Sequence, residues 1–232
     1  KDKNLEPINF DSLVCDMHSH LIAGIDDGSP DMETSIMLLK RFIDLGYQKV
    51  ITTPHIMSDY YRNTPEIINN GLDLVRKEID DQKLNIEIDA AAEYNLEPNF
   101  VTLLKEKNIL SFGPQNYVLF ELSFFEEPPD LSETIWLMRD QGYTPVLAHV
   151  ERYAYWHLDT DKYEEMINRG VKLQLNIGSV TGAYGLEVKR VANQLIKDNI
   201  IDFIGSDCHH EQHLEMISYA SKLPIFHQLV HQ

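Results

Sequence analysis

The chain has few cysteines, few positive charges and no long apolar run. Its 232 residues contain two cysteines, Cys15 and Cys208, which argues against a disulfide scaffold and for a reducing compartment. A cysteine-phosphatase nucleophile would need an Arg six residues later, where Leu21 and Leu214 stand. No apolar segment approaches a membrane span, and residues 1–10 lack the apolar core of a signal peptide. We therefore expect a cytoplasmic protein without membrane insertion.

Positive charge is scarce: 20 Lys and Arg oppose 37 Asp and Glu, giving a net charge of -17. Nucleic acid and anionic membranes are bound by clustered basic residues, so we expect neither as a partner. A solvated acidic surface explains most of the excess. Buried carboxylates around divalent cations would explain a further part, because bound cations neutralise them.

Apolar stretches of strand and helix type alternate along residues 1–232, which we interpret as one α/β domain. The expected strands are residues 12–16, 49–53, 86–92, 117–120, 145–148, 171–177 and 200–204. The expected helices are residues 30–45, 65–81, 100–106, 131–141, 163–168, 186–197 and 213–223. Such alternation predicts parallel strands with helical crossovers. The strands could close into a seven-stranded barrel or form an open doubly wound sheet.

Histidines and acids stand at the carboxyl ends of six of the seven expected strands. His18 and His20 lie two residues apart, so an extended strand points both side chains to the same face. The strand-end set is His18, His20, His55, Glu93, Glu121, His149, Asp207 and His209. Asp26 or Asp27, in the loop after the first strand, could add a ninth candidate or could simply be a loop or capping acid. In a barrel all these strand ends meet at one mouth, whereas the edge strands of an open sheet would hold theirs apart. The pattern therefore favours a barrel.

Five imidazoles and four carboxylates suit borderline-hard divalent ions, namely Mn, Fe, Zn or Ni. Nine ligands are too many for one ion, but bridging carboxylates would let them hold two or three. Such ions clamp a phosphoryl group and lower the pKa of a bound water, so a hydroxide could attack phosphorus in line. The implied reaction is phosphoester hydrolysis without a covalent enzyme intermediate. The alternative is that these are separate structural residues.

Several motifs share a resemblance to one family. They are Asp16-Met17-His18-Ser19-His20, Asp26-Asp27-Gly28, Thr53-Pro54-His55, Ala148-His149-Val150-Glu151-Arg152-Tyr153 and Gly205-Ser206-Asp207-Cys208-His209. Together they resemble the polymerase-and-histidinol-phosphatase (PHP) superfamily, and more narrowly its manganese-dependent bacterial tyrosine phosphatases of capsule and exopolysaccharide gene clusters. The resemblance covers about residues 16–209. It implies a distorted seven-stranded (β/α) TIM-like barrel with a trinuclear site, most often of manganese.

The resemblance also implies roles for individual residues. It selects Asp27 rather than Asp26 as a ligand, and it makes Arg152 the catalytic residue that binds phosphate, a role that suits a guanidinium. It implies three ion sites, formed by His18, His20, Glu93 and Asp207, by Glu93, Glu121 and His149, and by Asp27, His55 and His209. Relatives often carry a second phosphate-binding Arg after the last strand. Residues 210–215 contain none.

Aromatic residues are frequent in the loops expected at the mouth. They are Tyr60, Tyr61, Phe124, Phe125, Tyr153, Tyr155 and Trp156. We hypothesise that some of them flank the phenyl ring of an aryl phosphate, with Tyr155 and Trp156 as the first candidates for substrate binding. They could equally pack the loops onto the barrel.

These observations lead to one preferred function and three alternatives. The first expectation is a protein-tyrosine phosphatase whose partner is a bacterial tyrosine kinase controlling polysaccharide export; this substrate and pathway rest on the resemblance alone. A second is a small-molecule phosphatase such as a histidinol-phosphatase. A nuclease-like PHP domain is disfavoured by the acidic charge. A binding domain that has lost its metals is disfavoured by the nine intact ligand positions.

Overall fold

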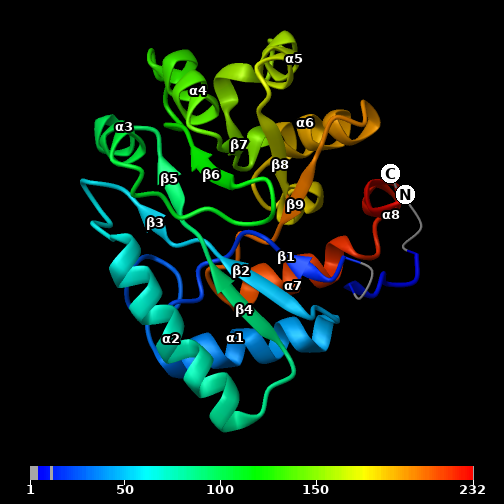
Figure 1. Ribbon diagram of the computed structural model, residues 1–232. Coiled ribbons are helices and arrows are strands. Elements are labelled where there is room, and N and C mark those ends of the chain that lie inside the picture. The colour runs from blue at the N-terminus through cyan, green and yellow to red at the C-terminus, as the bar shows by residue number, and fades with distance from the viewer. Residues whose placement is uncertain (1–4, 11–12, 232) are drawn as a thin grey trace.

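The computed structural model describes residues 5–10 and 13–231 as a curled parallel sheet with helices packed around its outside (Figure 1). The strands are β1 (Cys15–Asp16), β2 (Lys49–Thr52), β3 (His55–Ile56), β4 (Glu87–Ala90), β5 (Glu93–Asn95), β6 (Tyr117–Glu121), β7 (Thr144–Leu147), β8 (Lys172–Asn176) and β9 (Phe203–Gly205). The helices are α1 (Met32–Leu45), α2 (Pro65–Gln82), α3 (Pro98–Lys105), α4 (Leu131–Asp140), α5 (Asp161–Asn168), α6 (Leu186–Lys197), α7 (Glu211–Ala220) and α8 (Pro224–Val230). Three short 3₁₀ helices are η2 (Val150–Arg152), η3 (Ala154–Trp156) and η4 (Ile177–Thr181).

The strands form two parallel sheets, β1-β2-β4 and β3-β5-β6-β7-β8-β9. Within the described residues, nine strands replace the seven expected. The difference arises because two of the expected strands each correspond to a pair of strands, β2 with β3 and β4 with β5. Strands β2 and β3 are separated at Pro54, which has no N–H to donate to the hydrogen-bond ladder. Strands β4 and β5 are separated at residues 91–92, so Glu93 begins β5 instead of following a strand. The Glu93 N–H still donates to Pro54 O (3.1 Å), which keeps the two pairs of strands side by side.

Hydrogen bonds join the segments that follow β1 and β9, the first and last strands, and this closure favours the barrel over the open sheet. Just beyond β1 and β9, Asp207 N donates to His18 O (2.7 Å) and His20 N donates to Cys208 O (2.9 Å). The buried Asp16 carboxylate accepts from both the N–H and the hydroxyl of Ser206 (2.7 and 2.8 Å). The expected α/β class and barrel type are confirmed. The expected first strand began at Ser12, which lies outside the described residues.

Helix boundaries follow local capping. Helix α1 begins at Met32 rather than at Pro30, because the Asp31 carboxylate accepts from Thr34 N (2.8 Å) and so caps it. Gly46 ends this helix with a φ of 104°, in the left-handed region. The expected helix over 213–223 corresponds to α7, which ends at Ala220, and α8 is a further helix that was not expected. Leu223 lies between the two helices and precedes Pro224, and the residue before a proline is disfavoured in a helix.

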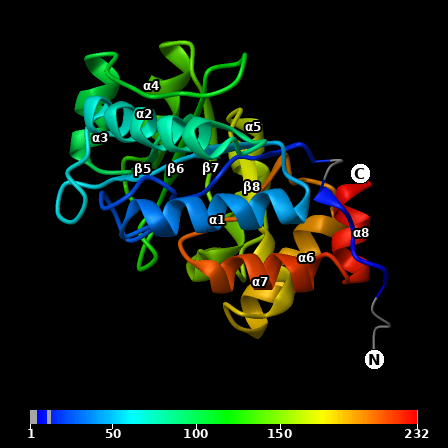
Figure 2. The ribbon, with the colours of Figure 1, turned by 90° about the horizontal axis from the view of Figure 1, so that it is seen from below.

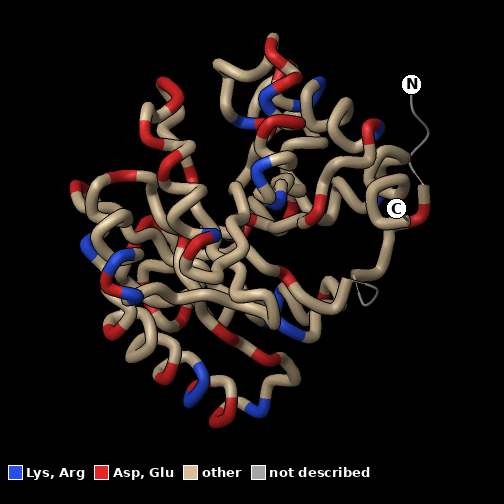
Figure 3. Tube along the Cα trace, turned by 45° about the horizontal axis from the view of Figure 1, so that its top comes forward, with Lys and Arg blue, Asp and Glu red and all other residues tan. Residues whose placement is uncertain are grey.

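The hydrophobic core lies between the sheet and the helices. Figure 2 shows α1, α2, α6 and α7 laid along the outside of the sheet, and each of these four helices buries one apolar face. Charged residues of both signs are scattered over the described chain, and acidic ones predominate in the view of Figure 3. Among the described residues, no helix combines the length and the apolar character needed to cross a bilayer.

Candidate metal centre

The structure brings all nine candidate ligands to one end of the curled sheet. His18 and His20 follow β1 and are fully buried, with ring centroids 5.5 Å apart. Glu93 is the first residue of β5, Glu121 is the last residue of β6, and His149 lies two residues after β7. All three are buried. Asp207 and His209 follow β9 and complete the set.

Glu93 lies at the middle of the cluster. Its Oε2 lies 3.1 Å from His18 Nε2, 3.4 Å from His20 Nε2 and 3.3 Å from His55 Nδ1. Its Oε1 lies 3.0 Å from His149 Nε2. One carboxylate thus faces four imidazoles, which is the arrangement expected of a bridging ligand.

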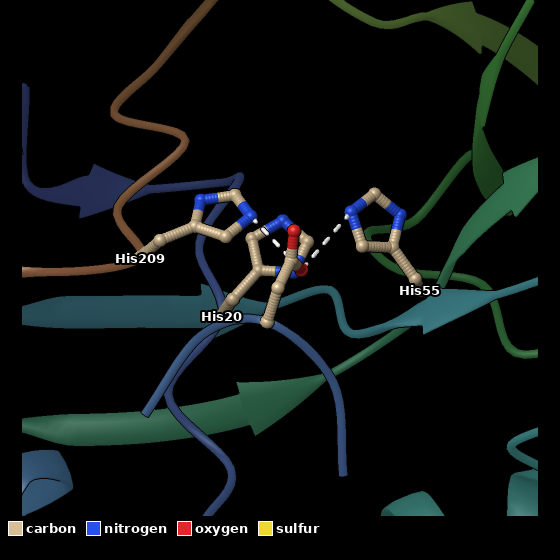
Figure 4. A group of neighbouring side chains, drawn as sticks. His20, His55 and His209 are labelled. Atoms are coloured by element: carbon tan, nitrogen blue, oxygen red, sulfur yellow. Dashed lines mark ion pairs between the residues drawn. The ribbon is translucent and has the colours of Figure 1, made fainter. Parts of the chain in front are cut away.

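A second carboxylate, that of Asp27, faces the histidines at the rim. Its Oδ1 lies 3.6 Å from His55 Nε2 and 3.4 Å from His209 Nε2. Figure 4 shows the His20, His55 and His209 rings lying close together, and its dashed lines mark the ion pairs that His55 and His209 form with Asp27. The side chain of Asp27 is 49% exposed, so this part of the cluster opens to solvent.

Donor atoms of eight of the nine candidates, all except His149, fall into three groups in which every atom lies within 4.8 Å of the others. The groups are His18, His20, Glu93 and Asp207; His20, Asp27, His55 and His209; and His55, Glu93 and Glu121. The first has the membership inferred from the resemblance, and the second adds His20 to the expected three. In the third, His55 stands beside the two glutamates where His149 was expected. His149 Nε2 nevertheless lies 3.8 Å from Glu121 Oε2. The assignment of ligands to ions therefore stays a prediction.

Buried opposite charges perturb the pKa values of the cluster. Burial alone would lower the pKa of His18, but the Glu93 and Asp207 carboxylates raise it to about 9. In the same way, burial would raise the pKa of Glu93, but the facing His18 and His55 imidazoles hold it well below its ordinary value. Without metal, the His18 imidazole therefore carries a proton near neutral pH, which balances part of the carboxylate charge. A bound divalent ion would replace that proton.

The backbone around the cluster is unusually constrained. His149 and Asp207 have φ values of 33° and 50°, in a region that costs a non-glycine residue roughly 1–3 kcal/mol. Gly28 packs so closely on His20 that an added Cβ would lie 2.2 Å from its carbonyl oxygen. Gly205 packs on His18, where an added Cβ would lie 2.7 Å from the His18 Cβ. These glycines explain two of the motif positions, because no other residue fits there.

Asp26, which sequence reasoning set aside as a ligand, orients the ligands. Its Oδ2 accepts from His20 Nδ1 (2.8 Å) and from the His55 N–H (3.1 Å), and its Oδ1 accepts from Gly28 N (3.0 Å). Although burial would raise the pKa of Asp26, the His20 imidazole lowers it to about 2. Asp26 thus fixes His20 with Nε2 toward the centre, the usual role of a carboxylate behind a metal-bound histidine.

Two further residues of β8 support the cluster and were missed by sequence reasoning. Gln174 Oε1 lies 3.0 Å from His18 Nδ1 and accepts from His149 N (2.8 Å). Asn176 Nδ2 donates to Asp207 Oδ2 (3.0 Å). The signal available in the sequence was the pair of amides, Gln174 and Asn176, which alternate with Leu173 and Leu175.

Arg152, the expected phosphate-binding residue, lies beside the cluster in η2. Its Nη1 donates to Asp207 Oδ2 (3.0 Å), and its side chain is 24% exposed. Its neighbour Glu151 is buried and turned away, accepting from Asn176 N (3.0 Å) and from the Ser179 hydroxyl. Arg152 therefore forms its ion pair with Asp207 and not with the adjacent Glu151.

The two aromatic residues first considered for substrate binding differ. Trp156 is 1% exposed, and its Nε1 donates to Glu127 Oε2 (2.7 Å). Contact between Trp156 and a substrate is therefore a wrong prediction, since the indole packs η3 onto the barrel. Tyr155 is half-buried and donates its hydroxyl to Ser123 O (2.8 Å). Its role in substrate binding stays a prediction.

The donor set fits divalent metal ions on its own geometry. His20 Nε2 and His55 Nδ1 are buried nitrogen atoms that find no hydrogen-bond partner within the described part of the chain. Both nevertheless face carboxylate oxygens at 3.3–3.5 Å. Buried polar atoms are normally paired, and a cation between nitrogen and oxygen would satisfy both. The mixed imidazole and carboxylate donors suit Mn, Fe, Zn and Ni without distinguishing them.

Comparison with known proteins places the chain in a family. The tyrosine-protein phosphatase YwqE of Bacillus subtilis is 26% identical over 85% of this chain and 78% of the relative. The tyrosine-protein phosphatase CpsB of Streptococcus pneumoniae is 28% identical over 85% of this chain and 83% of the relative. A solved structure from work on YwqE and CpsB, described as unique metal-dependent tyrosine phosphatases, superposes with a TM-score of 0.82 at 24% identity, covering 94% of this chain and 91% of that one. The family model described as capsular polysaccharide synthesis, CpsB/CapC, matches residues 14–216, and the chain belongs to this family.

Proposed function

We propose that the chain is a metal-dependent protein-tyrosine phosphatase that hydrolyses phosphotyrosine at a site of two or three divalent ions, with manganese the first candidate. The observation that carries the proposal is the convergence of nine imidazole and carboxylate side chains. Among the described residues, two of the nitrogens that face these carboxylates, His20 Nε2 and His55 Nδ1, are buried without a hydrogen-bond partner. The names of the relatives YwqE and CpsB support phosphotyrosine as the substrate.

The ligand roles are proposed for His18, His20, Asp27, His55, Glu93, Glu121, His149, Asp207 and His209. Divalent ions held there would polarise phosphoryl oxygens and lower the pKa of a bound water toward neutrality. Arg152 would pair with phosphate oxygens through the N–H groups that Asp207 leaves available. Asp26 and Gln174 hold the imidazoles in the required orientation.

The cysteines support a route without a covalent cysteinyl intermediate. Burial and the neighbouring Asp16 raise the pKa of the Cys15 thiol to about 12. Burial likewise raises the pKa of Cys208 well above its ordinary value. Neither thiol would ionise near neutral pH, and the thiolate is the form that acts as a nucleophile.

The partner and the location are also proposals. The family description, capsular polysaccharide synthesis, supports a role in polysaccharide production. We propose a bacterial tyrosine kinase of polysaccharide export as the phosphorylated partner. The two cysteines are free thiols, which agrees with a reducing cytoplasm. A single domain over residues 1–232 is supported by one large core cluster that runs from Phe10 to Val230.

The test compares three phosphorylated substrates with one protein preparation. Protein stripped of metal by chelation and then restored with Mn is offered a phosphotyrosine peptide, a phosphoserine peptide and histidinol phosphate. Release of phosphate from phosphotyrosine alone, dependent on Mn, is the expected result. Preference for histidinol phosphate would replace the proposal by a small-molecule phosphatase. Absence of turnover on all three would overturn it.

A further inference from the structure

Two aromatic rings that the metal centre does not use lie against Arg152. The Arg152 Cζ lies 4.9 Å from the centroid of the Phe124 ring and 4.6 Å from that of the Tyr184 ring. Phe124 stands in the loop after β6, Arg152 in η2 after β7, and Tyr184 in the loop that η4 opens after β8. Since β7 lies between β6 and β8 in the sheet, the two rings reach the guanidinium from loops on its two sides.

Arg152 needs such contacts because its polar attachment is limited. Among the described residues, its side chain makes one hydrogen bond, from Nη1 to Asp207 Oδ2 (3.0 Å). One bond leaves a long side chain free to rotate, whereas rings against the guanidinium restrict it and attract its charge. Neither ring takes an N–H donor in the guanidinium plane, so the donors stay available to a phosphate.

The Phe124 ring also connects Arg152 to the candidate ligands. It stacks on His149 with centroids 5.5 Å apart and an interplanar angle of 28°. It also stacks on the buried Tyr153 ring at 5.8 Å. Tyr153 is itself fixed by donating its hydroxyl to Ala148 O (3.1 Å). The Phe124 ring is therefore fixed by its stacking on His149 and Tyr153, and it presents a fixed surface to Arg152.

From these contacts we propose that Phe124 and Tyr184 form an aromatic clamp that positions Arg152 for phosphate binding. They are positioning residues, because they act through the guanidinium. The inference rests on the proposed function in one respect only, namely that Arg152 binds a phosphoryl group. The clamp itself rests on the geometry of the three side chains.

Orthophosphate binding to the Mn-loaded protein, followed by calorimetric titration, tests the proposal. Replacing either ring, as Phe124→Leu or Tyr184→Leu, should weaken binding by roughly 3- to 30-fold. Phe125→Leu is the matched control, because Phe125 is 95% exposed and makes no ring contact with Arg152. Tyr184→Phe keeps the ring and should restore binding to the wild-type level. Unchanged binding in both Leu variants would overturn the clamp.

A double-mutant cycle with Arg152→Ala separates positioning from general structural damage. In the Arg152→Ala background, Phe124→Leu and Tyr184→Leu should weaken phosphate binding no further. An equal further loss would show that the rings do not act through Arg152.

A second readout does not depend on phosphate at all. The ¹⁵Nε–¹H signal of Arg152, assigned with Arg152→Lys, should be sharp and shifted in the wild type and should move to the random-coil position in either Leu variant. If wild-type protein binds no orthophosphate, the proposed function fails while this signal still decides on the clamp. A random-coil signal in the wild type would overturn the clamp alone.

Discussion

Replacing Asp26 by Asn should weaken metal binding although Asp26 is not a proposed ligand. The carboxylate accepts three hydrogen bonds, from His20 Nδ1 (2.8 Å), His55 N (3.1 Å) and Gly28 N (3.0 Å). An Asn side chain has one acceptor oxygen and turns an NH₂ group toward at least one of these donors. His20 therefore loses either its orientation or the negative charge that makes its Nε2 a stronger donor to a metal.

The expected magnitude follows from what such supporting carboxylates contribute elsewhere. Loss of a residue behind a metal-bound histidine typically weakens metal binding by about 10- to 100-fold, which corresponds to about 1.4–2.7 kcal/mol.

The assay titrates metal-free protein with Mn in competition with a chelating dye. Asp59→Asn is the control, since Asp59 is exposed and lies outside the cluster. Turnover of an aryl phosphate by Asp26→Asn should recover when Mn is raised well above the new dissociation constant. Wild-type affinity in Asp26→Asn would refute the reasoning, as would lost turnover that no Mn concentration restores.

Two further predictions concern protonation and the buried indole. The neighbouring carboxylates outweigh burial and raise the pKa of His18 to about 9, whereas a metal-bound imidazole must be neutral. The affinity for Mn should therefore rise from pH 6 to pH 9, by up to about tenfold per pH unit for each displaced proton. Equal dissociation constants for Mn at pH 6 and pH 8 would contradict this prediction. Trp156→Phe removes the hydrogen bond to Glu127. It should lower the free energy of unfolding, measured by urea denaturation, by roughly 1–3 kcal/mol. The KM for an aryl phosphate should stay within about twofold of the wild-type value. A KM increase with unchanged stability would restore Trp156 as a substrate contact.

The positions of the candidate ligands were predictable because they follow from chain periodicity. Alternating strands and helices bring the carboxyl ends of parallel strands together. A histidine or acid at such an end must therefore lie near the others, as His18, His149 and Asp207 do. The spacing of His18 and His20 was sufficient to place both on one face.

Details that depend on contacts across the fold could not be predicted. Asp26 and Asp27 are adjacent and chemically identical, and only the folded loop turns one toward His20 and the other toward the rim. The separation of β2 from β3 at Pro54 and of β4 from β5 at 91–92 depends on how the neighbouring strands bend. Trp156 was placed at the mouth because its loop lies there, whereas the packing of η3 turned its ring inward.

Contacts between loops were equally invisible in the sequence. Phe124, Arg152 and Tyr184 come from three different strand-to-helix segments, and no local pattern relates them. Their contacts arise from the sheet order β6-β7-β8, which sets the three segments side by side. Sequence reasoning named Phe124 only as one of several aromatic residues and did not name Tyr184.

The most direct test of the central claim is the number of metal ions bound per chain, measured by elemental analysis together with turnover of phosphotyrosine. Wild-type protein equilibrated with Mn should hold two or three ions. Glu93→Gln should lose at least one ion together with phosphotyrosine turnover, because Glu93 faces His18, His20, His55 and His149 at once. Full phosphotyrosine turnover by metal-free protein or by Glu93→Gln would contradict the account.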